Sequence, residues 1–120
     1  MRRRVLIVDD NEAFRAAARQ LLERSGFVVV AEAGTGSEGI REAALKSPDL
    51  ALVDVQLPDC DGFEVAERLS GVKPAPEVIL TSSLDGSDFG ALVAGSSALG
   101  FIPKAELSAR AIEALLFPRD

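Results

Sequence analysis

The sequence predicts an α/β fold, a (βα)5 flavodoxin-like three-layer sandwich with a parallel five-stranded sheet. Continuous apolar runs recur along the chain and suit strands that are buried on both faces of a sheet. Segments with the period of a helix separate these runs, so each strand precedes a helix. A chain of 120 residues is long enough for one domain with a single core. The apolar runs are 5–8, 27–31, 50–53, 78–80 and 99–102.

The first two helices are indicated by apolar spacing and by capping residues. Residues 14–22 place apolar side chains on one helix face, and Gly26 follows as a C-terminal stop. Thr35 and Glu38 form a capping-box pattern at the start of the second helix, and Pro48 ends it. We therefore expect helices after the first and second strands.

Two of the remaining three helices carry similar signals. The third follows Asp61, has Glu64 at the capping-box position and closes before Gly71. The fifth covers about residues 108–117 and turns Ile112 toward the core.

The fourth helical segment, about residues 87–97, is the loosest of the five. Its expected inward face is Phe89, Leu92 and Val93. Gly90 and Gly95 lie in its expected interior, where each glycine costs about 1 kcal/mol relative to alanine. We expect this helix to rearrange most easily.

The order of the strands follows from connection rules and from one proline. Right-handed crossovers place helices on both faces of the sheet. Pro103 cannot donate to a sheet, so the fifth strand is expected at an edge. This favours the order 2-1-3-4-5, whose switch point lies between the first and third strands.

The composition excludes several classes of site. The chain has no histidine, which removes Ser-His-Asp and Cys-His catalysis and imidazole metal ligands. Cys60 is the only cysteine, which excludes an internal disulfide and makes a cytoplasmic location the expectation. The net charge of −6 argues against direct nucleic-acid binding. No apolar stretch is long enough for a membrane span, so no membrane contact is expected.

Four charged residues fall where strands are expected to end. Asp9, Asp10 and Asp54 each follow an apolar run, and Lys104 follows the last run. Two carboxylates about 4 Å apart repel by about 4 kcal/mol at an effective dielectric of about 20. Three Asp and one Lys sum to −2, so a divalent cation would neutralise the set. Oxygen ligands without histidine or thiolate favour Mg²⁺. The alternative is that these charges cap strand ends in solvent.

A second pattern points to a different ligand. Residues 34–39 read Gly-x-Gly-x-x-Gly between a strand and a helix, with Asp54 beyond them, which is the pattern of a dinucleotide-binding loop. The match follows the second strand rather than the first, and it would leave Asp9, Asp10 and Lys104 without roles. We favour a glycine-containing loop.

Four segments, in their order and spacing, resemble the receiver domain of two-component response regulators. They are Val8-Asp9-Asp10, residues 52–58 with Asp61-Gly62 after them, residues 79–82, and residues 100–104. The resemblance covers essentially all of residues 1–120 as one receiver domain. The C-terminal part is most similar to the NarL/LuxR group.

The resemblance implies a role for each site residue. Asp54 accepts a phosphoryl group, and Mg²⁺ is held by Asp9, Asp10, Asp54 and the backbone carbonyl of Gln56. Lys104 pairs with a phosphoryl oxygen. The Thr81 hydroxyl moves to bond another, and Phe101 follows inward as part of the switch.

It also implies partners. The phosphoryl donor is a sensor histidine kinase or a phosphotransfer protein. The domain then passes the signal to an output protein or domain. The surface formed by the fourth helix, fifth strand and fifth helix changes on phosphorylation and is also the surface through which a homodimer would form. Such a domain is not an enzyme beyond assisting its own phosphorylation and dephosphorylation. We expect a stand-alone receiver rather than a fragment of a longer transcription regulator.

Two residues depart from the commonest family pattern. Many members have proline after the lysine, in a cis peptide, whereas Ala105 follows here, so we expect a trans Lys104–Ala105 bond. Phe101 lacks the hydroxyl of the usual tyrosine, so the aromatic switch has no hydrogen bond to make.

Two other functions stay open at this point. A phosphatase of the haloacid-dehalogenase type also uses an aspartate nucleophile and Mg²⁺, but it needs a second carboxylate where Gln56 stands. A pseudo-receiver would act by protein contact without phosphorylation. The intact set of Asp54, Thr81 and Lys104 favours a working receiver.

Overall fold

The structure is a computed structural model that describes residues 3–83 and 89–117. Its strands form one parallel sheet in the order β2-β1-β3-β4-β5, which confirms the predicted order. The strands are β1 (Arg4–Val8), β2 (Val28–Ala33), β3 (Leu50–Asp54), β4 (Glu77–Ser82) and β5 (Gly100–Pro103). The helices are α1 (Glu12–Arg24), α2 (Gly36–Lys46), α3 (Gly62–Leu69), α4 (Gly90–Ala94) and α5 (Ala109–Leu116), with a 3-10 helix at Lys104–Glu106.

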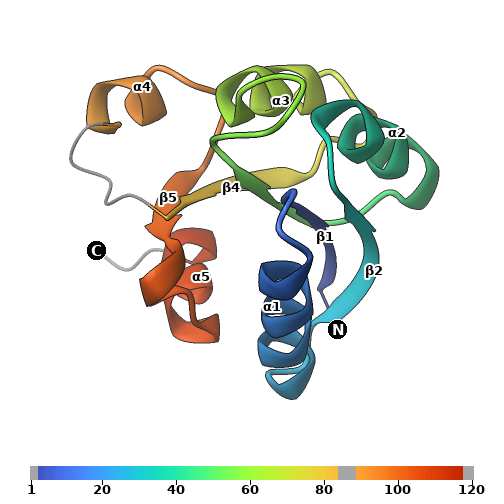
Figure 1. Cartoon of the computed structure of the whole chain (residues 1–120), viewed down its shortest axis with the longest axis vertical. Coiled ribbons are helices and arrows are strands. Elements are labelled where there is room, and N and C mark those ends of the chain that lie inside the picture. The colour runs from blue at the N-terminus through green and yellow to red at the C-terminus, as the bar shows by residue number, and fades with distance from the viewer. Residues whose placement is uncertain (1–2, 84–88, 118–120) are drawn as a thin grey trace.

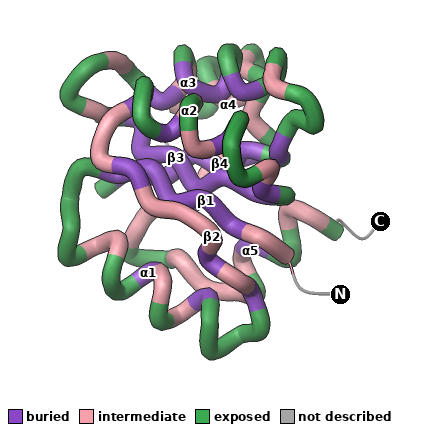
Figure 2. The backbone as a smooth tube through the Cα atoms, turned by 90° about the vertical axis from the view of Figure 1, so that its right-hand side faces the viewer, coloured by how far each residue is buried: buried purple, intermediate pink, exposed green. Residues whose placement is uncertain are grey.

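The helices cover both faces of the sheet. Helices α1 and α5 lie on one face, and α2, α3 and α4 lie on the other (Figure 1). Buried residues concentrate in the strands between these layers (Figure 2). Alternate residues of β1 point to opposite faces: Val5 and Ile7 pack toward α1 and α5, and Leu6 and Val8 pack toward α2 and α3. The continuous apolar runs are therefore explained by burial on both sides.

Four helices begin at a side chain that caps them. In each case an oxygen of the capping residue accepts a hydrogen bond from the backbone N–H three residues later. The capping residues are Asn11, Thr35, Asp61 and Ser108. The two capping positions predicted from sequence, Thr35 and Asp61, are thus confirmed.

Helix α4 is shorter than the sequence analysis predicted. It covers only Gly90–Ala94, and part of the predicted segment lies outside the described residues. Gly90 is its first residue and Gly95 follows its last, so the expectation that both glycines lie in the helix interior is wrong. Glycine is a poor helix former, and no side chain caps this helix at Phe89. Leu92 was expected to face inward, but it is 57% exposed.

The end of the sheet beyond β4 agrees with the predictions made from Pro103 and Lys104. Strand β5 is an edge strand, and Pro103 pairs only at its end, opposite Ser82. The Lys104–Ala105 peptide is trans, since Lys73–Pro74 is the cis bond found in the described part of the chain. None of the helices in the described ranges combines the length and apolar character needed to cross a bilayer.

Candidate functional site

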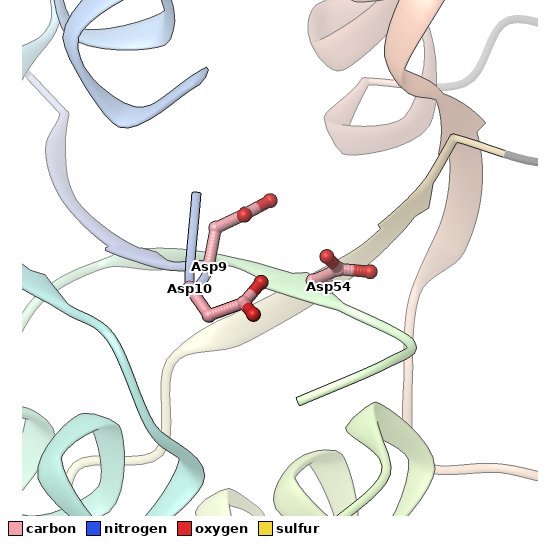
Figure 3. A group of neighbouring side chains, drawn as sticks. All are labelled: Asp9, Asp10 and Asp54. Carbon is pink, nitrogen blue, oxygen red and sulfur yellow. The ribbon is translucent and has the colours of Figure 1, made fainter. Parts of the chain in front are cut away.

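The carboxyl ends of β1 and β3 bring three aspartates together. Strands β1 and β3 are neighbours, with Val8 opposite Val53, so Asp9 and Asp10 begin where Asp54 ends β3. Side-chain oxygens of Asp9, Asp10 and Asp54 all lie within 4.8 Å of one another. Figure 3 shows the three side chains gathered at this edge of the sheet. The sequence prediction that these residues converge is correct.

Asp9 is the most buried of the three. Its side chain is only 1% exposed. Its backbone N–H donates to the carbonyl of Ala33 on β2 at 2.9 Å, and its Oδ1 accepts a hydrogen bond from the N–H of Asn11 at 2.9 Å. Asp10 is exposed, and its carboxylate lies beside those of Asp9 and Asp54 (Figure 3).

Lys104 reaches the aspartates from the end of β5. Its Nζ lies 2.6 Å from Oδ2 of Asp9 and 3.1 Å from Oδ2 of Asp54. The same ammonium lies 4.5 Å from the centre of the Phe14 ring, a cation–π distance. Burial lowers the pKa of Lys104, but the bonds to Asp9 and Asp54 outweigh it, and the pKa is raised overall. Lys104 therefore stays charged and neutralises part of the cluster.

Asp54 combines burial with a small number of hydrogen bonds. Burial raises the pKa of its carboxyl, while the hydrogen bond from the N–H of Gln56 and the bond to Lys104 oppose that rise without cancelling it. The Gln56 N–H donates to Oδ1 at 3.0 Å, so Oδ2 is the oxygen that meets Lys104. Each carboxylate oxygen of Asp54 thus has one partner that fixes its orientation.

The loop after Asp54 is held against the sheet by backbone hydrogen bonds. The N–H of Gly62 donates to the carbonyl of Val55 at 2.7 Å, and the N–H of Leu57 donates to the carbonyl of Cys60 at 3.2 Å. These bonds flank the paired residues Gln56 and Asp61, so the Gln56 carbonyl takes no part in the pairing. Its predicted role as a metal ligand stays a prediction.

Gly62 stands where a side chain would not fit. A Cβ atom at this position would collide with the carbonyl oxygen of Asp54 and would lie 2.9 Å from Cα of Val55. Both obstacles are backbone atoms, which cannot move aside as a flexible side chain would. The glycine after Asp61 therefore lets α3 begin directly against the strand that carries Asp54.

The two predicted switch residues lie on neighbouring strands. Thr81 on β4 is opposite Asp54 on β3 and is 1% exposed. Phe101 on β5 is opposite Leu80, is partly exposed, and its ring centre lies 5.6 Å from that of Phe89 beside α4. The structure thus places Thr81 next to Asp54 and Phe101 next to α4. The coupled movement of Thr81 and Phe101 stays a prediction.

The glycine-rich segment at α2 has a packing role. A Cβ atom on Gly36 would collide with Sγ of Cys60, and one on Gly39 would lie 2.7 Å from a methyl group of Val8. The N-terminus of α2, where a dinucleotide phosphate would bind, already holds the carboxylate of Asp59. Asp59 accepts hydrogen bonds from the N–H groups of Gly36 at 2.8 Å and Ser37 at 3.0 Å. This arrangement agrees with the preferred prediction of a packed loop.

Several contacts of the site were missed by the sequence analysis. Phe14 packs against the core as predicted, and its ring also lies beneath Lys104, a contact that the sequence analysis did not predict. Arg15 was given no role, although its Nη1 donates to the Asp9 carbonyl at 2.6 Å. No sequence pattern around Asp59 indicated that its carboxylate would accept hydrogen bonds from the start of α2. No periodic pattern links these pairs in sequence, so only their nearness to Asp9 and Asp54 along the chain could have drawn attention to Phe14, Arg15 and Asp59.

Comparison with known proteins decides the family. The sequence model described as "Response regulator receiver domain" matches residues 5–116. The chain belongs to the response regulator receiver family. A candidate transcriptional regulator of Pseudomonas aeruginosa is 42% identical to this receiver over 103 residues, which are 86% of this chain and 50% of that protein. The transcriptional regulatory protein PdtaR of Mycobacterium tuberculosis is 39% identical over 80 residues, which are 67% of this chain and 39% of that protein.

Solved receiver structures share the fold. A LuxR-family two-component response regulator from Aurantimonas sp. matches with a TM-score of 0.87 and 31% identity, over 99% of this chain and 88% of that one. A receiver domain from Methanospirillum hungatei described as CheY-like has a TM-score of 0.82 and 28% identity, over 97% of this chain and 92% of that one. The resemblance to receivers of the LuxR group, noted from the sequence, is thus confirmed. This receiver spans about half the length of the first curated relatives it matches.

Proposed function

We propose that this receiver accepts a phosphoryl group on Asp54 and passes the signal to an output protein or domain through the surface formed by α4, β5 and α5. The observation that carries the proposal is the position of Asp54. Its carboxylate lies among two further aspartates and within 3.1 Å of the Lys104 ammonium, at the carboxyl edge of the sheet. Receiver domains belong to two-component signalling, and the chain is a member of that family over residues 5–116.

The proposed reaction transfers a phosphoryl group between two side chains. An Asp54 oxygen attacks the phosphorus of a phosphohistidine on a sensor kinase or a phosphotransfer protein. The new P–O bond forms as the P–N bond breaks, and the leaving imidazole keeps the electron pair and takes up a proton. The receiver sequence itself has no histidine, so the phosphohistidine is supplied from outside these 120 residues. Lys104 is placed to meet the negative charge that the phosphoryl oxygens bring.

The residues at the site fit Mg²⁺. Asp9, Asp10 and Asp54 offer oxygen ligands only, within 4.8 Å of one another, which is the donor set of a hard divalent cation. We assign them as protein ligands together with the Gln56 carbonyl. When bound, Mg²⁺ would supply the positive charge that phosphoryl transfer to a carboxylate requires.

The output surface is proposed from the packing of the aromatic rings. The rings of Phe63, Phe89 and Phe101 form a row, with centres 6.2 Å and 5.6 Å apart, that connects α3 with α4 and β5. A new charge on Asp54 draws the Thr81 hydroxyl toward the phosphoryl group and lets Phe101 repack, which changes this row and the helix above it. Partner binding and homodimer formation through the same surface belong to this proposal.

The test is intact mass after incubation with acetyl phosphate and Mg²⁺. The wild type is expected to gain one phosphoryl group, and the gain is expected to disappear with EDTA and in Asp54→Asn. Asp59→Asn is the matched control, because Asp59 is a nearby carboxylate that contacts α2 instead of the cluster. A chain that gains no phosphoryl group from acetyl phosphate or from any histidine kinase would act as a pseudo-receiver, and the proposal would be wrong.

A further inference from the structure

We infer that Arg15 is a positioning residue for the metal site: its guanidinium holds the peptide that joins Asp9 to Asp10 and so sets the direction of both carboxylates. The inference rests on the Mg²⁺ site of the proposed function. It concerns a residue of α1 that has no side-chain contact with the ligand oxygens among the described interactions.

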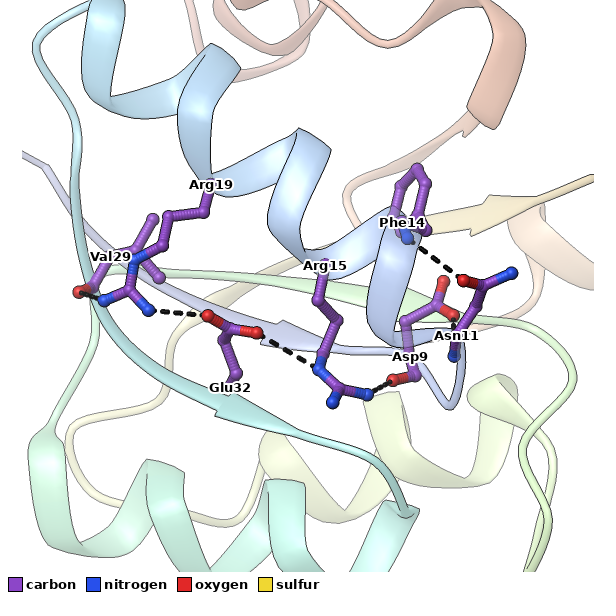
Figure 4. Close-up of polar contacts among 7 residues, drawn as sticks. All are labelled: Asp9, Asn11, Phe14, Arg15, Arg19, Val29 and Glu32. Atoms are coloured by element: carbon purple, nitrogen blue, oxygen red, sulfur yellow. Dashed lines mark hydrogen bonds and ion pairs between the residues drawn. The ribbon is translucent and has the colours of Figure 1, made fainter.

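The decisive contact is with the backbone of Asp9. Nη1 of Arg15 donates to the Asp9 carbonyl at 2.6 Å (Figure 4). That carbonyl is part of the planar peptide between Asp9 and Asp10, so fixing its direction restricts the Cα positions of both residues. The other side of Asp9 is fixed by its N–H, which donates to Ala33 of β2 at 2.9 Å. The backbone of Asp9 is therefore held between α1 and β2.

Arg15 is itself held in place by Glu32. Nε of Arg15 lies 3.1 Å from Oε1 of Glu32 on β2, and the side chains are 18% and 25% exposed. The second oxygen of Glu32 meets Nη1 of Arg19 at 2.5 Å, and Arg19 also donates to the Val29 carbonyl at 3.2 Å. Glu32 thus lies between two arginines one helical turn apart. Glu32 is bound to two arginines and therefore has little freedom to rotate. Its ion pair with Arg15 holds the guanidinium in the orientation that donates to the Asp9 carbonyl.

Groups that orient metal ligands affect metal affinity without touching the ion. Removing such a group commonly weakens binding by about ten- to a hundredfold. A guanidinium beside the site also repels Mg²⁺, so the simple electrostatic effect of removing it is tighter binding. Positioning and electrostatics therefore predict changes in opposite directions.

The experiment is titration of the full chain with Mg²⁺ by calorimetry, without any phosphoryl donor. Arg15→Met is expected to bind Mg²⁺ about tenfold more weakly than the wild type. Arg19→Met is the matched control: it loses the same charge and a bond to the same Glu32, but Arg19 does not contact Asp9. Its affinity is expected to equal or slightly exceed that of the wild type. Thermal unfolding in EDTA checks that both variants are folded.

Each outcome decides the inference. Binding by Arg15→Met that equals or exceeds wild-type affinity would overturn it, and so would an equal loss in Arg15→Met and Arg19→Met. If Arg15→Met does not fold, Arg15→Lys takes its place. The single ammonium of lysine cannot hold Glu32 and the Asp9 carbonyl as the guanidinium does, so Mg²⁺ binding is expected to weaken at unchanged charge. Wild-type Mg²⁺ affinity in Arg15→Lys would contradict the inference. A wild type that binds no Mg²⁺ would overturn the metal site of the proposed function, and this inference with it.

Discussion

Lys104 and Asp9 form an ion pair of 2.6 Å across the carboxyl edge of the sheet, although 95 positions separate them in the sequence. The Asp9 side chain is 1% exposed and that of Lys104 is 16% exposed, so this pair is largely removed from water. The same ammonium also meets Asp54. Lys104 thus contacts two of the three aspartates and offsets part of the repulsion among them.

Replacing Lys104 should therefore destabilise the metal-free domain. Loss of one partner from a buried pair costs about 3 kcal/mol, because the remaining charge stays buried without compensation. We expect Lys104→Met to lower the free energy of unfolding in urea by about this amount in EDTA, and by clearly less in Mg²⁺, since a dication takes over the neutralisation. Lys73→Met is the control, because Lys73 is exposed. Equal losses with and without Mg²⁺ would contradict the prediction.

Asp54 should make the metal-free domain less stable as pH rises. Burial raises the pKa of Asp54 in the folded state, so the folded chain holds its proton more tightly than the unfolded chain. The resulting stabilisation is complete below the ordinary pKa of an aspartate, about 3.9, and is lost as pH increases through the higher folded pKa. The carboxamide of Asp54→Asn does not titrate and stays neutral at every pH of the experiment. We expect it to be more stable than the wild type at neutral pH in EDTA.

The check on Asp54 is urea unfolding of both proteins at several pH values from about pH 4 to pH 7. The stability of Asp54→Asn minus that of the wild type should grow as pH increases. Other titrating groups are common to the two proteins and largely cancel in the difference. A difference that is constant, or that shrinks with pH, would show that burial of the Asp54 charge is not unfavourable.

The Asp59 carboxylate should stabilise the start of α2. It accepts hydrogen bonds from Gly36 and Ser37, and these bonds, chiefly the one from Gly36, hold the pKa of Asp59 below its ordinary value. Asp59→Ala is expected to lower the thermal midpoint at neutral pH and to speed amide exchange at Gly36 and Ser37. The stabilisation is present above the ordinary pKa of the group and disappears as pH falls through the lowered pKa.

The effect of Asp59→Ala should accordingly shrink in strong acid. Glu77→Ala is a suitable control, because Glu77 is exposed at the start of β4, at the opposite end of the strand from the aspartate cluster. If the two variants change the thermal midpoint equally at neutral pH, then Asp59 contributes nothing through α2.

Two glycines offer a matched comparison. A Cβ on Gly62 meets the backbone of Asp54 and Val55, whereas a Cβ on Gly90 meets no atom within 4 Å. Gly62→Ala is expected to destabilise the domain by about 2 kcal/mol or more, as overpacking against backbone does, and to slow phosphorylation by acetyl phosphate because Asp54 must shift. Gly90→Ala should be neutral or should stabilise the domain by up to about 1 kcal/mol. Urea unfolding of both variants checks this, and equal effects would be inconsistent with the packing.

Phosphorylation should change amide exchange locally. We expect slower exchange in α4 and β5 after phosphorylation, because Phe101 repacks against the row of rings, and no change in α1. Exchange measured by mass spectrometry before and after acetyl phosphate treatment tests this, with Asp54→Asn treated in the same way. Identical exchange of α4 and β5 in both states would remove this route of signalling.

Much of the fold could be predicted because local patterns and tertiary structure agree. Apolar runs without alternation indicated strands covered on both faces, and Pro103 indicated an edge. Helix α4 could not be placed correctly, since its spacing of apolar residues resembled a longer helix. In the structure the helix begins at Gly90 and ends before Gly95. Phe89 and Val93 pack inward, and Leu92 is exposed to solvent.

The convergence of Asp9, Asp10, Asp54 and Lys104 needed only the sequence, because the carboxyl ends of parallel strands must meet at one edge of the sheet. The individual contacts needed the folded chain. Oδ2 of Asp9 and Oδ2 of Asp54 share one ammonium, the Phe14 ring lies beneath it, and Arg15 reaches the Asp9 carbonyl. Such contacts join side chains from different elements at distances of a few ångströms. No periodicity in the sequence encodes those distances, which depend on how the helices pack against the sheet.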